Sequence, residues 1–303
     1  MFDEKCMMIP RGTKFGERTI VALGDVVVAD YSRVEYNLEV PGNLYVGENV
    51  RIDGDLDVSG EARIDGWSAI SGDVKCGGDI FLGHSVKITG GLFAGSNLDV
   101  GEDVEIGDGF EAKGWITVRD PIPIVIYIFI YILQLIGIGK SDEVEKIVKE
   151  LEEIKDEEIR VRRGYLYIPR WSRITRDGIK VRKGFKICAK SGCRLSGNCL
   201  GGRIELGDKT ALMGSIRAES YVRIGAEGEV GGSIHAKGSV VLGNGVRIGG
   251  KISASRVEMS KSSAVEGRIR ADEGIIFIPE EGEEGGIEQE LFEKSIDLGK
   301  ALE

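Results

Sequence analysis

The sequence predicts an all-β protein built as a parallel, triangular β-helix with about 18 residues in each coil. Two observations carry this prediction: pairs of apolar residues recur every six positions, and glycines recur at three times that interval, at Gly54, Gly72 and Gly90. Three six-residue units would then make one coil, with glycine where a sharp bend leaves no room for a Cβ. Each coil buries its inward side chains only against the coils above and below it.

The six-residue pattern is nearly unbroken through the first part of the chain. Every sixth residue from Leu38 to Ile116 is apolar, and so is every sixth residue from Val40 to Val118, with Ser68 as the single polar exception. The residue between the two members of a pair is mostly charged. This in–out–in alternation is typical of a short strand, and a helix cannot maintain it.

The same pattern returns later in the chain after an interruption. The phrase Gly-x-Ile-x-Ala begins at Gly214, Gly232 and Gly250, and once more at Gly267. We therefore expect five parts: an N-terminal segment (1–24), a first β-helical block (25–118), an insertion (119–158), a second β-helical block (159–278), and a linker with a short C-terminal helix (279–303). The pattern leaves open whether the two blocks form one rod or two.

The insertion combines an uncharged run over 121–139 with a predicted amphipathic helix over 141–155. A complete membrane span needs ~20 apolar residues, and prolines and glycines at its ends leave this run shorter. Three interpretations stay open: a span, a shallow or re-entrant membrane finger, and packing against the amphipathic helix or another subunit. The candidates for membrane association are Ile124, Ile126, Tyr127, Ile128, Phe129, Ile130, Tyr131, Ile132 and Leu133, together with Arg160, Arg162 and Arg163.

A basic run follows the insertion. Residues 160–186 hold ten basic residues and a single acid, Asp177, interleaved with Tyr165, Tyr167, Trp171 and Phe185. The run suits an anionic membrane surface. It equally suits pairing with the acidic stretch over 142–158. Nucleic acid is not expected as a partner, because the whole chain carries a formal charge of −10 and no RNA-binding motif accompanies the arginines.

Composition argues against metal and cofactor chemistry. Two histidines, His84 and His235, cannot supply a three-histidine zinc site within one chain, which leaves only a site shared between subunits. Both take ordinary outward or corner positions of the six-residue pattern, so we expect no catalytic residue. A polymer held together by stacked coils requires no metal or cofactor. The five cysteines form no CxxC pair and are expected to be reduced thiols in the cytoplasm. Cys193 and Cys199 stand six apart, as small inward-facing residues would. The N-terminus lacks the pattern of a secretory signal.

The alternative to a structural role is a hexapeptide-repeat acyltransferase with a left-handed β-helix. Aliphatic–glycine steps such as Val46-Gly47 and Leu82-Gly83 fit that family. The position two residues before the aliphatic residue often holds a bulky side chain, as at Leu44 and Ile80, where the tight left-handed pattern requires a small one. This departure favours a structural protein that is not an enzyme.

The Gly-x-Ile-x-Ala phrases, followed by Val-x-Ile units, resemble the bactofilins, a family of polymer-forming cytoskeletal proteins. The resemblance covers about 25–118 and 178–277, and the chain differs from the family in having two blocks around a long apolar insertion. It implies a right-handed β-helix and a nucleotide-independent scaffold that polymerises end to end and attaches to the inner face of the cell membrane. The expected partners are other copies of the chain, the membrane surface and client proteins that the sequence does not identify.

An end-to-end polymer needs contact residues at the ends of the rod. The coils at a rod end expose unpaired strands and an aliphatic cross-section, which another subunit can cover. We expect these contacts at Val26 and Val28, near the start of the first block, and at Ile275 and Phe277, near the end of the second.

Overall fold

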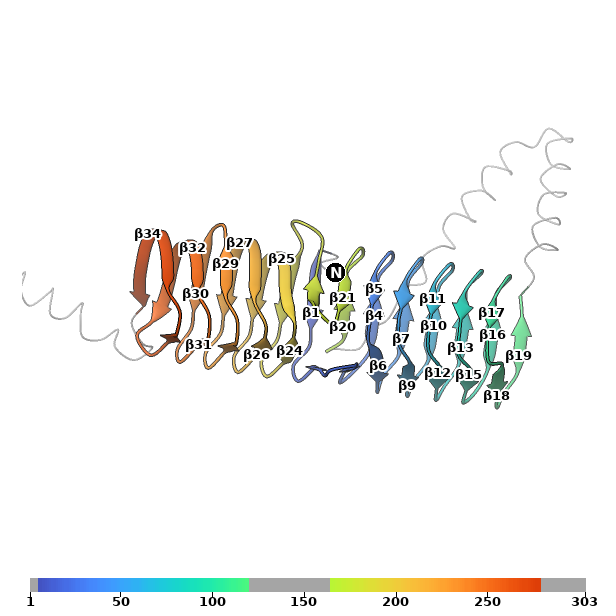
Figure 1. Ribbon diagram of the computed structural model, residues 1–303. Helices are drawn as coiled ribbons and strands as arrows, with labels where there is room; N and C mark the ends of the chain where they lie inside the picture. Colours follow the sequence, from blue (N-terminus) through green and yellow to red (C-terminus); the bar gives the residue numbers. More distant parts are fainter. Residues whose placement is uncertain (1–4, 120–163, 279–303) are drawn as a thin grey trace, which may run out of the picture.

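The computed structural model describes residues 5–119 and 164–278, and every regular element in these two ranges is a β-strand. The strands stack into one continuous rod (Figure 1). One sheet that runs along the rod contains 12 strands, one from each coil. With neighbouring strands about 4.8 Å apart, the rod is roughly 55–60 Å long. The predicted all-β solenoid is therefore confirmed, and the two blocks form a single rod.

The first block winds toward one end of the rod with three faces. The first face holds β4 (Val26–Val28), β7 (Leu44–Val46), β10 (Ala62–Ile64), β13 (Ile80–Leu82), β16 (Leu98–Val100) and β19 (Ile116–Val118). The second holds β5 (Arg33–Val34), β8 (Arg51–Ile52), β11 (Ala69–Ile70), β14 (Lys87–Ile88) and β17 (Glu105–Ile106). The third holds β3 (Thr19–Val21), β6 (Asn37–Val40), β9 (Leu56–Val58), β12 (Val74–Cys76), β15 (Leu92–Ala94) and β18 (Phe110–Ala112).

The second block winds toward the opposite end. Its first face holds β23 (Lys186–Ala189) and β30 (Ser239–Leu242), and its second holds β24 (Arg194–Ser196), β26 (Ala211–Met213), β28 (Glu229–Val230), β31 (Arg247–Ile248) and β33 (Ala264–Val265). Its third holds β22 (Gly178–Lys180) and β29 (Ile234–Ala236). Four long strands bend from the third face onto the first: β25 (Asn198–Leu206), β27 (Ile216–Ile224), β32 (Ile252–Ser260) and β34 (Ile269–Ile278).

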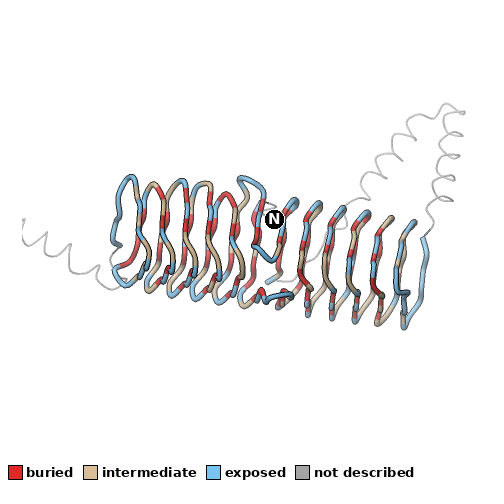
Figure 2. The backbone as a smooth tube through the Cα atoms, in the orientation of Figure 1, coloured by how far each residue is buried: buried red, intermediate tan, exposed pale blue. Residues whose placement is uncertain are grey.

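Apolar stacking along each face forms the core. Parallel register places Leu44, Ala62 and Ile80 directly over one another, eighteen residues apart, and all three are fully buried. Charged residues between the inward pairs point to solvent, so the interior is continuous and apolar from coil to coil (Figure 2). The predicted inward-facing cysteines, Cys193 and Cys199, are confirmed as core residues.

The eighteen-residue glycines are needed because adjacent coils approach closely. A Cβ on Gly54 would lie 2.5 Å from the carbonyl oxygen of Tyr36 in the neighbouring coil, and a Cβ on Gly72 would lie 2.7 Å from the carbonyl carbon of Gly54. Their φ angles are not in the left-handed region. The requirement is thus set by contact between coils, and not by the bend that the sequence pattern suggested.

The two blocks meet at their amino-terminal coils in the middle of the rod (Figure 1). Two further strands complete the second block at this junction: β1 (Cys6–Ile9) pairs with β23, and β2 (Lys14–Phe15) pairs with β24. Conversely, β20 (Leu166–Ile168) and β21 (Arg173–Thr175) complete the first block by pairing with β4 and β5. Each half of the sequence therefore supplies a terminal coil to the block built by the other half.

Strand direction reverses on all three faces of this junction. The pairs β1–β20, β2–β3 and β21–β22 are antiparallel, whereas every other strand pair within the described ranges is parallel. A twofold rotation perpendicular to the rod would superpose this arrangement of strands on itself. Because a rotation preserves hand, the two blocks wind with the same handedness.

A local sequence repeat follows the same pseudo-twofold relation. Ile-Pro-Arg occurs at 9–11 and again at 168–170. In each case the isoleucine is the last residue of a strand, β1 or β20, and the proline and arginine begin the turn that follows. The buried hydroxyl of Thr13 donates to the carbonyl of Pro10 at 2.9 Å, and Ser172 donates to Pro169 in the same way. The two turns satisfy their backbone groups identically, as expected for equivalent positions.

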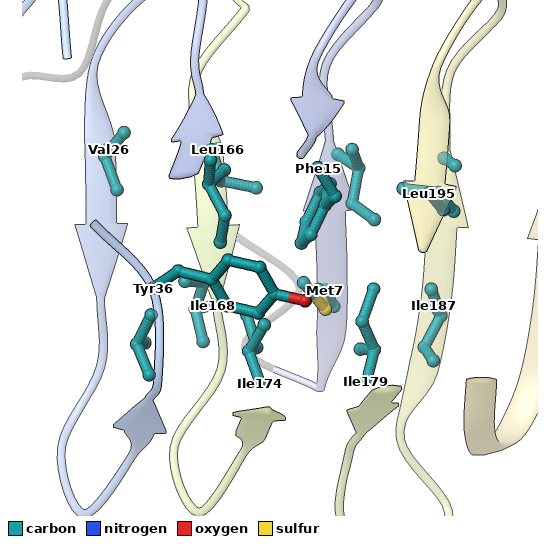
Figure 3. Close-up of a cluster of buried hydrophobic side chains, with 14 of the residues drawn as sticks. Met7, Phe15, Val26, Tyr36, Leu166, Ile168, Ile174, Ile179, Ile187 and Leu195 are labelled. Atoms are coloured by element: carbon teal, nitrogen blue, oxygen red, sulfur yellow. The ribbon is translucent and has the colours of Figure 1, made fainter. Parts of the chain in front are cut away.

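Side chains from both blocks pack into one core at the junction (Figure 3). Met7 and Phe15 from the N-terminal strands meet Ile168 and Ile174 from the second half of the sequence. The rings of Phe15 and Tyr36 pack edge to face, with centroids 6.3 Å apart. The rod therefore has no internal open end, since the junction is as closely packed as the rest of the core.

Side-chain ladders also hold successive coils together at one corner. The Asn37 side-chain oxygen accepts a hydrogen bond from the Asp55 backbone N–H at 2.9 Å, and Asp55 accepts one from Asp73 at 3.0 Å. These acceptors recur every eighteen residues, next to the glycines that recur at the same interval. They satisfy backbone donors that lie outside the strand ladders.

Several predicted parts lie outside the described residues: the uncharged run, the amphipathic helix at 141–155 and the short C-terminal helix within 279–303. Within the described ranges the structure contains no helix that could span a bilayer.

Candidate assembly surfaces

The end of the first block presents an uncovered apolar cross-section. Among the described residues, β18 and β19 each pair with a single neighbour, β15 and β16 respectively. Phe110 stands in register with Leu92, which is buried, yet Phe110 is exposed. Trp115, in the connection between β18 and β19, is 83% exposed. Phe110 takes the same inward position as Leu92, and it is exposed because no further coil in the described ranges covers it.

The end of the second block has the same character. Within the described part of the chain β34 pairs only with β32, and its register places Ile275 and Phe277 over Val257 and Met259, which are buried. Phe277 is 57% exposed. The structure thus puts both predicted contact residues, Ile275 and Phe277, on the open cross-section of a rod end.

Val26 and Val28 do not lie at an end of the rod. β20 covers β4, with Leu166 over Val26 and Ile168 over Val28, and both valines are fully buried. Another molecule therefore cannot reach them in the folded chain. The sequence placed them at an end because the covering strand comes from 140 residues further along the chain, where the six-residue pattern is weak.

The predicted membrane residues Ile124, Ile126, Tyr127, Ile128, Phe129, Ile130, Tyr131, Ile132, Leu133, Arg160, Arg162 and Arg163 all lie outside the described residues. Part of the basic run is described. Arg173, Arg176, Lys180, Arg182 and Lys183 are exposed at the junction, on β21, on β22 and in the loops beside them.

An edge of the rod beside this basic region carries three large aromatic residues, Tyr31, Trp67 and Trp171, which we call the aromatic edge. The connections 169–172, 29–32, 47–50 and 65–68 stack along it. The N–H of Trp171 donates to Asp30, that of Tyr31 to Glu48, and that of Trp67 to His84. Tyr31 and Trp67 were not among the residues predicted from the sequence. Their separation of 36 residues, two full coils, was the available signal that they share an edge.

Two cysteines from distant parts of the sequence meet at the junction. The Cys6 thiol donates to the Cys188 sulfur, with the two Sγ atoms 2.8 Å apart. This hydrogen bond from Cys6 lowers the pKa of Cys188, against the effect of its burial, and Lys186 and Lys190 act in the same direction as the bond. Burial raises the pKa of Cys199 to about 12. The thiols therefore differ greatly in expected reactivity.

We expect Cys188 to be alkylated first when the native protein is treated with iodoacetamide near pH 8, because the thiolate is the reacting species. Cys199 should react only after unfolding. Mass spectrometry of the peptides measures the order. Replacing the donor, Cys6→Ala, should shift the pH dependence of Cys188 labelling to higher pH; an unchanged profile would show that Cys6 does not stabilise the thiolate.

The histidines take part in surface packing. The His84 ring packs edge to face against Trp67, with centroids 3.9 Å apart, and His235 stands in register with Arg217 on an outer face. Within the described ranges no group of three or more His, Cys, Asp or Glu side chains is placed to hold a metal ion.

Comparison with protein families matches residues 186–282 to the model described as "Bactofilin: Polymer-forming cytoskeletal". Comparison with curated proteins and with solved structures found no match. The matched range takes in nearly the whole second block, from β23 to its open end at β34, and the parallel solenoid described above is consistent with the fold of that family. Residues 186–282 of this chain are therefore similar to a bactofilin domain, from a family described as polymer-forming and cytoskeletal.

Proposed function

We propose that the chain is a nucleotide-independent, filament-forming scaffold that polymerises through the two ends of its rod. One observation carries this proposal: inward positions that are buried in the inner coils become exposed in the last coil at both ends, where the outermost strands also lack a partner on one side among the described residues. Another copy of the chain supplies both the missing apolar neighbour and the missing hydrogen bonds.

The junction determines what kinds of contact such a polymer can contain. The amino-terminal coils of both blocks are sealed together inside each rod. Both free ends are therefore carboxyl-terminal coils. When two blocks of the same hand meet through their carboxyl-terminal coils, the strands of one run antiparallel to the strands of the other. Each contact between subunits would therefore repeat the strand reversal found at the junction.

We also propose that the polymer lies at the cytoplasmic face of the cell membrane and takes no part in catalysis. The support for this location is the apolar run over 121–139, the basic run that follows it, and the described thiols, none of which forms a disulfide in the described ranges.

Negative-stain microscopy of the purified chain tests the proposal. In buffer free of nucleotide and divalent cations we expect unbranched filaments, and their number should not change when ATP or GTP is added. Single rods at every protein concentration tried, or filaments that appear only with nucleotide, would contradict it. Compact trimers that bind an acyl carrier would favour the acyltransferase alternative.

A further inference from the structure

The aromatic edge holds large side chains in a backbone conformation that disfavours them. Tyr31, Trp67 and Trp171 have φ angles of 57°, 56° and 58°, in the left-handed region. The same position in neighbouring coils carries Asn49, Ser85 and Asp103, all at positive φ, so the coil geometry sets this conformation. Asparagine and aspartate tolerate it best, and nothing in the backbone calls for a large aromatic side chain there. Residues that suit their backbone conformation poorly are often functional.

The three aromatic side chains are also strongly exposed, at 51% for Tyr31, 53% for Trp67 and 43% for Trp171. They stand along one straight edge, in which Tyr31 and Trp67 are two coils and hence about 10 Å apart. The coil geometry explains the left-handed φ, but it explains neither the aromatic side chains at these positions nor their exposure. Both are expected of a surface that contacts a partner.

Neighbouring side chains pack against all three rings, which restricts the partner. Trp171 stacks on Tyr31 with centroids 5.8 Å apart and an angle of 13° between the rings. The Arg182 guanidinium lies 4.5 Å from the centroid of the Trp171 ring, and His84 packs against Trp67. A sugar or a nucleic-acid base needs a free ring face for stacking. The edge therefore offers a partner packed, partly exposed amphipathic rings, the form in which Trp and Tyr occur at lipid headgroups.

Positive charge is concentrated beside the edge. Arg173 stands directly across from Lys180 on one side and Arg33 on the other. Like charges placed opposite one another across strands are unfavourable. Arg33 is neutralised by Glu35 and Asp53, but within the described ranges no ion pair involves Arg173, Lys180 or Arg182. An anionic partner would relieve this repulsion, although the chain as a whole is acidic.

We infer that the aromatic edge, with Arg173, Lys180 and Arg182, is a contact surface for an anionic phospholipid bilayer. The rims of Tyr31, Trp67 and Trp171 enter the headgroup layer, and the three cations bind lipid phosphates. The edge runs along the rod, so the rod lies flat on the membrane with its junction against the lipid. This inference rests on the proposed membrane attachment and gives it a site in the described structure.

Vesicle flotation with two sets of variants tests the surface. The chain should float with phosphatidylcholine vesicles that contain phosphatidylglycerol and much less with phosphatidylcholine alone. Combined Tyr31→Asn, Trp67→Asn and Trp171→Asn should reduce flotation at least ~10-fold. The pair Arg173→Gln and Lys180→Gln should reduce it roughly 25-fold at low salt, about fivefold for each charge. Met213→Asn removes an exposed apolar side chain from another face and should have no effect.

Thermal unfolding separates a contact role from a structural one. Asparagine suits the left-handed backbone, as at Asn49, so the triple variant should melt at the native temperature or above it. A lower melting temperature with native flotation would make the edge a packing feature and overturn the inference. The Gln pair involves exposed side chains and keeps its fold in either case.

Tryptophan fluorescence locates the contact directly. The chain has three tryptophans, so Trp115→Phe leaves only the two of the aromatic edge. We expect brominated phosphatidylglycerol in the vesicles to quench their emission. Flotation without quenching would assign membrane binding to another segment, and binding to a DNA duplex in place of vesicles would assign the edge to nucleic acid; either result overturns the inference. The polymer proposal is tested separately, by whether filaments form without lipid. If they form, it holds even when the membrane inference fails; if they do not form, it fails and the membrane inference is unaffected.

Discussion

Val28→Asp is expected to unfold the protein, because Val28 lies at the junction and is completely buried beneath Ile168. The substitution loses the burial of the valine, about 1.5–3 kcal/mol, and places a carboxyl group where no partner reaches it, at a further cost of about 2–7 kcal/mol. The sum is a large part of the 5–15 kcal/mol that is typical of a domain, so about 4 kcal/mol or more should be lost. Urea denaturation followed by circular dichroism measures the loss.

Val27→Asp is the matched control for this prediction. Val27 neighbours Val28 on β4 but points to the outer face and is only partly buried. Its substitution should cost about 1 kcal/mol or less. If Val28→Asp folded with native stability and merely failed to polymerise, Val28 would lie at a free end, and the junction described here would be wrong.

Phe277→Glu is expected to abolish filaments while leaving the rod folded. Phe277 occupies an inward position of the last coil and is more than half exposed, so a charge there has little effect on the isolated subunit. In the polymer the same side chain would be buried against the next rod. Loss of a central aromatic contact costs about 2 kcal/mol or more, which raises the concentration needed for polymerisation by at least ~30-fold. Sedimentation at increasing protein concentration measures this threshold.

Ile276→Glu controls for the charge itself. Ile276 lies on the same strand with similar exposure, but it stands in register with Glu258 and so takes an outward position. A glutamate there points to solvent beside Glu258, whose charge is already paired with Arg256, and filaments should form as in the native chain. Equal loss of filaments in the two variants would place the contact on the outer faces of the rod.

The periodic part of the fold could be read from the sequence because its information is local. Pairs such as Leu44 and Val46 specify a short strand, and the next coil repeats the signal eighteen residues later. Burial then follows from register alone. The open cross-section at Ile275 and Phe277 was predictable for the same reason, since the pattern simply stops there.

The junction could not be read in this way. β20 covers β4, and β1 pairs with β23, over separations of about 140 and 180 residues, and neither coil keeps the six-residue spacing. The repeated Ile-Pro-Arg at 9–11 and 168–170 was the available clue. It marks two equivalent turns, but three residues are too few to show which strands the turns join.

The aromatic edge lay outside the sequence prediction for a different reason. Tyr31 and Trp67 occupy connections between strands, where the apolar pattern carries no information. Only the stacked coils show that residues 36 apart share an edge and that Trp171 joins them from the other half of the chain.

The exchange of terminal coils at the junction has a consequence for how the molecule could be divided. β1 and β2 cap the block encoded by the later part of the chain, and β20 and β21 cap the earlier one. If the chain were divided into two polypeptides between 119 and 164, each would carry the two strands that cap the block of the other. The two fragments would then bind each other specifically without a covalent connection, because each one completes the block of the other.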